Sequence, residues 1–505
     1  MTYEFTALTN KHLFLKKFNS QRNQAPFNLP SAEEIVALSC SKKQPFFAYL
    51  AWQGDEILGA ATFTLNRKRH RGVKLDCFEL IGCDFFDYNF FFCHEACMSA
   101  FLQFIKEDAK QYLVDAVLIE NVLLTLDAQP RSFQLDCKTN IFECLPGANS
   151  DFSFITKKKS LRRHSNKLRA KYNVEIEHFV GKVAHEQMLM LADMHKRRWA
   201  YESVNSAFNT ESRIATYLAY TENKLLTILK CNDEVVAMHY GMLFDKTLLW
   251  HTPIINIKYL DYSPLEILLY ETALFCSQQE LKALDFGLGQ EVYKHRFSNS
   301  NRNVYIGLIP VSSKGWLCYF FQKNIHTEKI RKNLILLRYK IKCCVKWCMR
   351  LNRNIEYYAY LSNNHGVVPQ FKLVVIDSFA DLYDLFILNN MKLEMYHYQR
   401  IKDKNMFLCL VDERQEILCC GWSTFAPTFF VGEINKLIDN KSKMMLYDYV
   451  TPLAHRNRGY YTHLLTLIAD TFKEHSPVIF AERKNIASNK AIMKAGFRKA
   501  IYEVL

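Results

Sequence analysis

The fold of the C-terminal third is decided by one stretch of sequence, Tyr447-Asp448-Tyr449-Val450-Thr451-Pro452-Leu453-Ala454-His455-Arg456-Asn457-Arg458-Gly459-Tyr460-Tyr461-Thr462. An alternating strand runs into a basic turn that contains glycine, and the turn opens an amphipathic helix. The start of a helix presents unpaired N–H groups and a partial positive charge, so it can bind a pyrophosphate through the backbone. Arg456 and Arg458 add positive charge, and Gly459 lets the backbone approach a phosphate closely.

A second strand and helix follow this stretch. Val478–Glu482 is predicted as a strand, and Asn485 is predicted to cap a short helix that runs to Lys494 and stops at Gly496-Phe497. Residues 500–504 are predicted as a last strand. One basic turn with a glycine would be a weak signal, whereas two strand–helix units in this order are a much stronger one.

This order of elements resembles the GNAT acetyltransferase superfamily. The phosphate-binding turn of that family, Arg/Gln-x-x-Gly-x-Gly/Ala, is matched by residues 456–461, and its later Asn-x-x-Ser and Gly-Phe elements are matched by residues 485–488 and 496–497. The resemblance covers residues 365–505 and implies that acetyl-CoA binds in the wedge between two splayed parallel strands. The residues that it implies for binding this co-substrate are Val450, Arg456, Asn457, Arg458, Gly459, Tyr460, Tyr461, Thr462, Asn485 and Ser488.

Two positions depart from the family pattern. Tyr461 stands where the turn usually has a small residue, although the backbone N–H of Tyr461 is still present. Many family members have a tyrosine four residues before the glycine of the Gly-Phe pair, and it protonates the leaving thiolate. That position is Ile492 here, so the general acid is unassigned.

The chemistry that the resemblance implies is direct acyl transfer. A base removes a proton from the substrate amine, the amine attacks the thioester, and backbone N–H groups hold the developing oxyanion. Asp448, on the strand before the phosphate turn, is the candidate base, either directly or through a water. The alternative is that Asp448 is simply an exposed strand carboxylate, and the sequence leaves both interpretations open.

Three β-hairpins recur along the chain, at residues 46–65, 225–244 and 406–423. Each consists of an apolar run, a polar turn and a returning strand. Residues 90–110 have helical spacing and precede a strand-like segment, so the first part of the chain also alternates between helix and strand. This repetition suggests three related units.

The middle of the chain carries a second resemblance, through Lys157-Lys158-Lys159-Ser160-Leu161-Arg162-Arg163, residues 191–199, Tyr262-Ser263-Pro264 and residues 284–297. These motifs resemble the acetyltransferases of cellulose and exopolysaccharide biosynthesis (the CelD/BcsL type), which are related to the Fem aminoacyltransferases. The likeness spans about residues 40–312 and implies two GNAT-like halves. Leu265 departs from it, because the family usually has glycine there.

By this second resemblance, residues 285–294 face a substrate cleft, and Asp285 and Lys294 are catalytic candidates. Lys294 would meet an anionic group or the developing charge. The alternative interpretation is structural: Asp285 caps the loop, and Lys294 pairs with a carboxylate.

The composition limits the other classes of protein. Charged residues make up 23% and hydrophobic residues 49% of the 505 residues, so the chain has enough material for packed cores. The net charge of +14 suggests an anionic partner, but no RNA-binding module is recognisable, and a nucleic acid is not favoured. The 16 cysteines are scattered without metal-ligand spacing, so no metal is expected.

The sequence also bears on membrane contact and location. Residues 327–353 form a basic amphipathic stretch that is interpreted as a connector helix, with peripheral contact to a membrane as the alternative. No secretory signal and no apolar run of membrane-spanning length is visible, so a cytoplasmic protein is expected.

Together these patterns predict an α/β (α+β) protein of three GNAT-like units, with mixed, mostly antiparallel sheets flanked by helices. The predicted divisions are a degenerate half at 1–150, a CelD/Fem-type half at 151–312, a basic helical connector at 313–362 and a GNAT domain at 363–505. The expected activity transfers an acetyl group from acetyl-CoA to an amine or glycan acceptor, with a role in exopolysaccharide or cell-envelope biosynthesis. Two alternatives stay open: Fem-like transfer by the front pair to a peptidoglycan or glycan precursor, and a non-catalytic scaffold.

Overall fold

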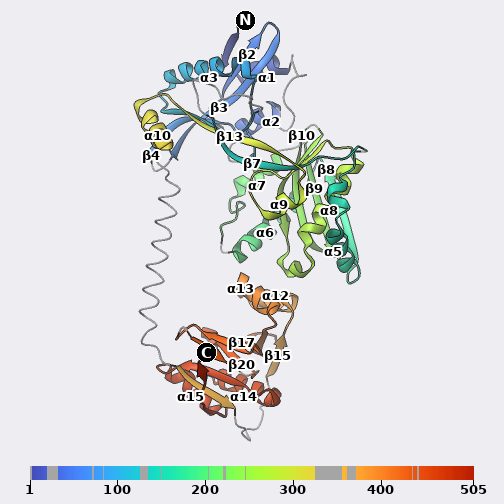
Figure 1. Ribbon diagram of the computed structural model, residues 1–505, viewed down its shortest axis with the longest axis vertical. Helices are drawn as coiled ribbons and strands as arrows, with labels where there is room; N and C mark the ends of the chain where they lie inside the picture. Colours follow the sequence, from blue (N-terminus) through green and yellow to red (C-terminus); the bar gives the residue numbers. More distant parts are fainter. Residues whose placement is uncertain are drawn as a thin grey trace. The chain divides into compact units, whose positions relative to one another are not determined.

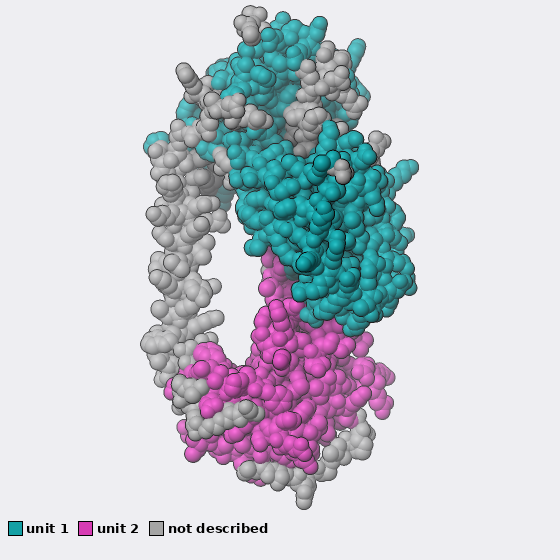
Figure 2. All heavy atoms as spheres, turned by 45° about the vertical axis from the view of Figure 1, so that its right-hand side comes forward, with its two compact units in different colours: residues 1–199, 205–327 teal, residues 200–204, 328–505 magenta. Residues whose placement is uncertain are grey.

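The computed structural model describes residues 3–504 except 20–31, 42, 71–72, 83–84, 125–134, 149, 203, 220–222, 245, 325–354, 361–370, 435 and 441–442. The chain forms two compact units, which are coloured separately in Figure 2: residues 1–199 with 205–327, and residues 200–204 with 328–505. Both units combine helices with a large mixed sheet, as the sequence predicted. No helix among the described residues is both long and apolar enough to span a membrane.

The first unit is organised around one 13-stranded sheet (Figure 1). Its strand order is β1-β2-β3-β4-β6-β13-β7-β12-β11-β10-β9-β8, and β5 pairs with β3. The strands are β1 (Glu4–Leu8), β2 (Phe47–Gln53), β3 (Glu56–His70), β4 (Val73–Leu80), β5 (Phe91–Cys93), β6 (Ala116–Leu123), β7 (Asp136–Cys144), β8 (Val174–Val180), β9 (Lys224–Cys231), β10 (Glu234–Phe244), β11 (Thr247–Ile255), β12 (Ala283–Asp285) and β13 (Ser300–Pro310).

The middle of this sheet interleaves the two predicted front halves. Strand β13, from the second half, lies between β6 and β7 of the first half and pairs with both in antiparallel fashion. Strand β7 in turn pairs with β12 of the second half. Three separate units are therefore not confirmed, because the first two predicted units share one continuous ladder of hydrogen bonds.

Helices pack on the sheet of the first unit. The helices are α1 (Lys11–Asn19), α2 (Ala32–Ser41), α3 (Glu95–Ala109), α4 (Ser153–Thr156), α5 (Lys159–Arg169), α6 (His185–Tyr201), α7 (Glu211–Ala219), α8 (Pro264–Gln278), α9 (Val292–Phe297) and α10 (Ser313–Asn324). Helix α3 contributes Phe101, Leu102 and Ile105 to an apolar cluster with β2, β3 and β6. Helix α8 packs Ile267 and Leu268 against β9, β10 and β11.

The predicted hairpins are confirmed as β2/β3, β9/β10 and β16/β17, each antiparallel. The helix predicted over residues 90–110 is wrong at its start. Residues 91–93 form β5, and the helix begins only at Glu95, where the Nδ1 atom of His94 accepts a hydrogen bond from the N–H of Ala96. The apolar run of phenylalanines before His94 is compatible with either periodicity, and its pairing with β3 is not visible in a local pattern.

The second unit has a seven-stranded sheet of order β15-β16-β17-β20-β21-β14-β22, and a small sheet of order β18-β19-β23. Its helices pack on the sheet around a core that includes Leu446, Leu464, Ile468 and Ile479. Its elements are β14 (Ile355–Tyr360), β15 (Lys372–Ile376), α12 (Phe379–Leu388), α13 (Met395–Lys402), β16 (Met406–Val411), β17 (Ile417–Thr424), β18 (Thr428–Val431), β19 (Lys436–Asp439), β20 (Met445–Val450), α14 (Tyr460–Thr471), β21 (Val478–Glu482), α15 (Ile486–Lys494), β22 (Phe497–Lys499) and β23 (Glu503–Val504).

The ends of the second unit differ from the sequence prediction. A single last strand was predicted at 500–504, whereas the structure has β22 at 497–499 and β23 at 503–504, in two different sheets. Within the predicted connector, 313–362, the structure describes α10 in the first unit and β14, which lies between β21 and β22 in the second. Residues 327–353 fall outside the described residues, so the basic amphipathic stretch stays a prediction.

The interleaved sheet leads to a test of the division at residue 150. Residues 1–150 and 151–312 expressed as separate chains should each stay unfolded, because β6 and β7 lose β13 and β12. Mixing or co-expressing the two should restore the structure, since the missing strands are then supplied in trans. Limited proteolysis and tryptophan fluorescence can measure this, with residues 1–327 as the control. A stably folded 1–150 fragment would contradict the prediction.

Candidate functional site

Two neighbouring parallel strands of the second unit separate after a short stretch of pairing. Strand β20 pairs with β21 only at Met445 with Val478 and at Leu446 with Ile479. Beyond these pairs β21 continues to Glu482 against β14, whereas residues 447–450 of β20 have no β21 partner among the residues described. An unpaired strand edge next to a parallel neighbour offers backbone N–H and C=O groups to a ligand.

A β-bulge at Asp448 bends β20 at this point. Tyr447 pairs with Trp422 and Val450 pairs with Cys420 on β17, so Asp448 and Tyr449 together face the single residue Gly421. Asp448 has a φ of +54°, which is uncommon for a residue with a side chain. A Cβ atom at Gly421 would lie 2.5 Å from the ring of Tyr449, so the bulge requires glycine opposite it.

The predicted phosphate turn lies at the start of α14. Gly459 adopts a φ of +82°, and a Cβ atom there would meet no atom within 4 Å. Arg456, Asn457 and Arg458 are exposed, and the Nε atom of Arg456 donates to the carbonyl of Thr451 at 3.1 Å. The helix that follows has 12 residues, and its first N–H groups have no acceptor within the helix. The turn therefore has the open backbone and the positive charge that binding a diphosphate requires.

Tyr461, at the position where the family pattern has a small residue, turns its ring toward α15. Its hydroxyl lies 3.3 Å from the hydroxyl of Ser488, and its ring centroid lies 6.0 Å from that of Tyr449. Burial raises the pKa of Tyr461 to about 12. The ring thus joins the starts of two helices and stays at least 4 Å away from the Cβ position of Gly459.

The remaining predicted co-substrate residues lie close to this turn or to β20. Asn485 caps α15, since its Oδ1 atom accepts from the N–H of Ser488 at 3.1 Å. Val450 is exposed at the end of β20, and Tyr460 and Thr462 are half-buried in the first turn of α14. Ile492, where the family pattern has a tyrosine, is fully buried in the core.

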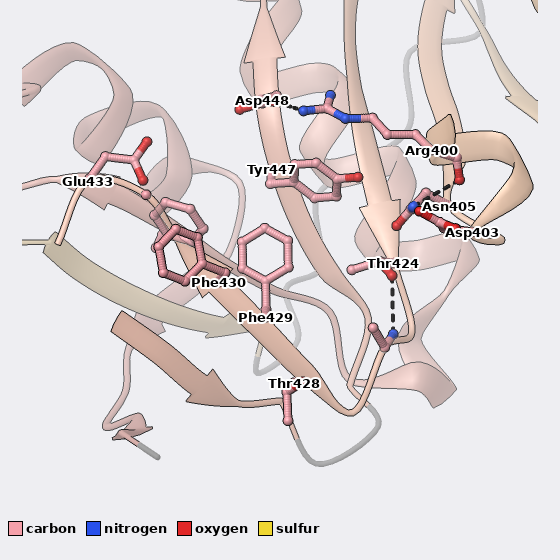
Figure 3. Close-up of a pocket in the computed structure, with 13 residues that line it drawn as sticks. Arg400, Asp403, Asn405, Thr424, Thr428, Phe429, Phe430, Glu433, Tyr447 and Asp448 are labelled. Atoms are coloured by element: carbon pink, nitrogen blue, oxygen red, sulfur yellow. Dashed lines mark hydrogen bonds and ion pairs between the residues drawn. The ribbon is translucent and has the colours of Figure 1, made fainter. Parts of the chain in front are cut away.

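Asp448 carries a partner that the sequence did not reveal. Arg400, at the end of α13, forms an ion pair with Oδ2 of Asp448 (Figure 3). The guanidinium lies 4.9–5.2 Å from the ring centroids of Tyr396, Trp422 and Tyr447. These rings hold Arg400 by cation–π contact, and Arg400 in turn orients Asp448. A helix 48 residues away in sequence could not be linked to Asp448 from local signals.

A pocket of about 480 Å³ opens beside Asp448 and the separating strands. Figure 3 shows Phe429 and Tyr447 near its centre, with Glu433 on one side and Asp403 on the other. Phe429 packs against Tyr447 and Phe480 at centroid distances of 4.9 and 5.9 Å. Glu433 is half-buried and, among the described residues, has no hydrogen-bond or ion-pair partner. Because Arg400 and Asp448 neutralise each other, the remaining charge of the pocket is negative.

The first unit brings the other two catalytic candidates onto one loop. Asp285, at the end of β12, is fully buried and accepts hydrogen bonds from the hydroxyl of Tyr88 at 2.7 Å and the N–H of Gly287 at 2.8 Å. Arg302 approaches it at 3.2 Å. Burial raises the pKa of Asp285 to about 6, against the opposing effect of the Arg302 charge.

Lys294 is also buried and closes the other end of this loop. Its Nζ atom donates to the carbonyl of Leu288 and lies 3.0 Å from Glu291. The contacts of Asp285 and Lys294 agree with the structural interpretation of the sequence, in which Asp285 caps the loop and Lys294 pairs with a carboxylate. The catalytic roles of both residues stay predictions. Tyr88 and Arg302 were missed, because Tyr88 is 197 residues from Asp285 in sequence and Arg302 reaches it only through the pairing of β13 with β7.

The first unit also contains a parallel pair with a crossover helix. Strands β11 and β12 pair in parallel at Thr247 with Ala283, Leu248 with Leu284 and Leu249 with Asp285, and α8 connects them. Beyond Leu249, β11 runs on to Ile255 while β12 ends. No group of three or more His, Cys, Asp or Glu side chains in the described part of the chain could hold a metal ion.

The raised pKa of Asp285 predicts a pH dependence of stability. A carboxyl whose pKa rises from 3.8 when unfolded to about 6 when folded makes folding less favourable as pH increases from about 4 to 6. The loss at neutral pH is on the order of 3 kcal/mol. Asp285→Asn removes this titration, so its unfolding free energy relative to wild type should improve between pH 4.5 and 7. Urea titrations of both proteins at the two pH values test this, and a pH-independent difference would contradict it.

Comparisons with known proteins find a family match in the middle of the chain. Residues 156–295 match the family described as acetyltransferase (GNAT) domain. Among solved structures, FemX is similar with a TM-score of 0.43 and 10% identity, over 62% of this chain and 98% of that chain. A tandem GNAT protein from the clavulanic acid biosynthesis pathway is similar with a TM-score of 0.36 and 10% identity, over 62% of this chain and 99% of that one.

A further similar structure is the C-terminal domain of a putative lysylphosphatidylglycerol synthetase from Agrobacterium fabrum. Its TM-score is 0.38 and its identity 9%, over 61% of this chain and 95% of that chain. No curated protein sequence matches the chain.

Proposed function

We propose that this chain, which contains a GNAT acetyltransferase domain over residues 156–295, transfers an acyl group from acyl-CoA to an amine, and that its C-terminal unit carries out the transfer. One observation carries the proposal. Strands β20 and β21 separate after two paired residues, directly before an open glycine turn at the start of α14. A strand edge and a helix start in this order suit a co-substrate with an amide-containing arm and a diphosphate.

The residues present fit such a co-substrate. Arg456 and Arg458 would meet the diphosphate, and the N–H groups of residues 460–462 would bind its oxygens. The free edge of β20 at residues 447–450 would pair with the amides of the arm. Acetyl-CoA supplies an acyl group that is activated as a thioester. The role of the protein is to hold that group next to an amine and to exclude competing water.

The pocket beside Asp448 is the proposed acceptor site. An amine must lose a proton before its nitrogen can attack a carbonyl carbon, and Asp448 is a carboxylate on the unpaired part of β20 that lines the pocket. Arg400 engages Oδ2 of Asp448, so the other oxygen, Oδ1, remains to accept the proton, directly or through a water. The backbone N–H groups of the β20 edge are the candidates for stabilising the oxyanion.

The charge and the rings of the pocket favour a cationic acceptor over a neutral sugar. Glu433 offers a carboxylate that has no partner among the residues described, and Phe429, Tyr447 and Phe480 offer aromatic faces to an ammonium or its carbon chain. A glycan hydroxyl would leave the Glu433 charge uncompensated. We therefore favour an amine whose body or second group is positively charged.

Acetyl-CoA binding tests the phosphate turn. Gly459→Glu should reduce the affinity for acetyl-CoA by at least about tenfold in isothermal titration, because it places a carboxylate where the diphosphate would lie. Gly459→Ala should cost less, since a Cβ atom there meets no neighbour and only the backbone is strained, by about 1 kcal/mol.

Gly54→Glu is the matched control for this experiment. Gly54 has a φ of +61°, and a Cβ atom there would also meet nothing within 4 Å, but it lies in the first unit. This variant has the same backbone strain and the same added charge, so it should bind acetyl-CoA like wild type. Equal binding by all three variants would remove the turn from the proposal.

Two substitutions in the pocket should separate chemistry from acceptor binding. Asp448→Asn should lower kcat by about 10²-fold or more, because it removes the base. Glu433→Gln should raise KM for a cationic amine about fivefold and change kcat little, as expected for the loss of one partly exposed charge contact. The assay is release of free CoA thiol across a panel of amines and amino sugars. Glu413→Gln, an exposed charge removal in the β16–β17 turn, should leave both constants unchanged.

A second candidate activity is favoured by the position of the family match, which includes β11, α8 and β12 of the first unit. Here the front unit would transfer an acyl or aminoacyl group to a glycan or peptidoglycan precursor, with Lys294 facing the anionic group. Acetyl-CoA binding that Gly459→Glu leaves intact would favour this candidate. No binding of acetyl-CoA to wild type would favour a different donor or the non-catalytic scaffold.

A further inference from the structure

Helix α10 exposes an apolar face where the first unit ends. Trp316, Leu317 and Phe320 are 52%, 49% and 59% exposed, while Gly315 and Cys318 on the opposite side are buried. The spacing i, i+1 and i+4 places the three exposed side chains on one face. Large apolar side chains that gather on one exposed helix face mark an interaction surface rather than chance exposure. We call Trp316, Leu317 and Phe320 the α10 face.

The packing of α10 prevents it from rolling this face inward. A Cβ atom at Gly315 would lie 2.0 Å from the carbonyl oxygen of Asp115, so the helix already sits as close to that turn as backbone allows. The Oδ1 atom of Asp115 accepts a hydrogen bond from the hydroxyl of Ser312 at 2.7 Å, and its Oδ2 atom accepts one from Lys314 at 2.9 Å. These contacts fix the rotation of α10, and its apolar face is held outward.

The loop that anchors α10 exposes another large apolar side chain. Leu113, two residues before Asp115, is 90% exposed and has a φ of +53°, a conformation that bulky residues rarely adopt. A polar residue would be at least as stable at such an exposed position, so solvent contact alone does not explain a leucine.

Lysine side chains border the α10 face. The Nζ atom of Lys106 lies 5.4 Å from the ring centroid of Trp316, and Lys314 is half-exposed on α10 itself. In the sequence, residues 323–353 carry many lysines and arginines and one acidic residue, Glu328. A tryptophan, a phenylalanine and a leucine beside lysine side chains match the interface of an anionic bilayer, where rings sit among head groups and ammonium groups meet phosphates.

We propose that the α10 face docks the protein on the surface of an anionic lipid bilayer. Trp316, Leu317 and Phe320 enter the head-group region, and Lys106 beside Trp316 contacts lipid phosphates. This charge complementarity distinguishes lipid from a second copy of the chain, because the copy would bring the same lysines and the same net charge of +14 to the contact. The proposal does not depend on the acyl-transfer reaction.

Vesicle sedimentation with the full-length protein tests the proposal. Wild type should bind vesicles of phosphatidylcholine with 30% phosphatidylglycerol at least tenfold more tightly than vesicles of phosphatidylcholine alone. Trp316→Glu with Leu317→Glu should weaken binding to the anionic vesicles at least tenfold. Leu189→Glu with Met190→Glu is the matched control, since these neighbours on α6 are 45% and 42% exposed, and it should bind like wild type.

Each other outcome overturns the proposal. Undiminished binding by the α10 variant would mean that lipid contact, if present, is made by the basic sequence at 327–353 without the α10 face. An equal loss of vesicle binding in both double variants would mean that the added negative charge acts at long range. Added salt would then reduce the difference in vesicle binding between the control variant and wild type. Sedimentation velocity without lipid tests for a dimer. A dimer that forms with wild type and not with the α10 variant would assign the α10 face to a second copy of the chain instead. Circular dichroism confirms that each variant is folded.

Discussion

The C-terminal unit depends on one constraint: backbone groups of β20 that lose their neighbour β21 must be paired by something else. Strand edges inside a sheet are rarely left open, because each unpaired N–H or C=O group loses a hydrogen bond. The bulge at Asp448 lies in this unpaired part of β20, and Gly421 makes the bulge sterically allowed. The same bulge turns Asp448 toward the pocket and Tyr449 toward the helices. A single irregularity therefore links the strand gap, the pocket beside Asp448 and the space between α14 and α15.

The first unit uses parallel pairs in a different way. Strands β4 and β6, connected through α3, and β11 and β12, connected through α8, repeat the arrangement of β20, α14 and β21. In the first unit, however, β13 and β7 fill the centre of the sheet and tie both pairs into one body. Shared strands raise the cooperativity between the halves, since neither half completes its hydrogen bonds alone. The second unit completes its own sheet, with β14 closing the far side of β21.

Sequence reasoning predicted those features that local signals determine. The three hairpins and the start of α14 follow from apolar periodicity, turn residues and Gly459, which all act within a few residues. It missed the partners that come from far along the chain: Arg400 for Asp448, and Tyr88 for Asp285 across 197 residues. The placement of β13 and β14 inside their sheets was likewise invisible, because a strand pattern does not name its neighbours. The sequence did flag Tyr461 as a departure, but only the structure gives its direction, toward Ser488.

The loop between Asp285 and Lys294 illustrates why such residues are ambiguous in sequence. Both side chains are charged types buried inside the protein, and buried charges persist only with partners. Asp285 satisfies the N–H of Gly287, and Lys294 satisfies the carbonyl of Leu288, so the two charges fix adjacent parts of one loop. A loop held in this way keeps a single conformation, which is what a binding edge needs as well as what a stable fold needs. Structural and catalytic pressure would thus select the same residue types here, and only kinetics on the intact loop can separate the two.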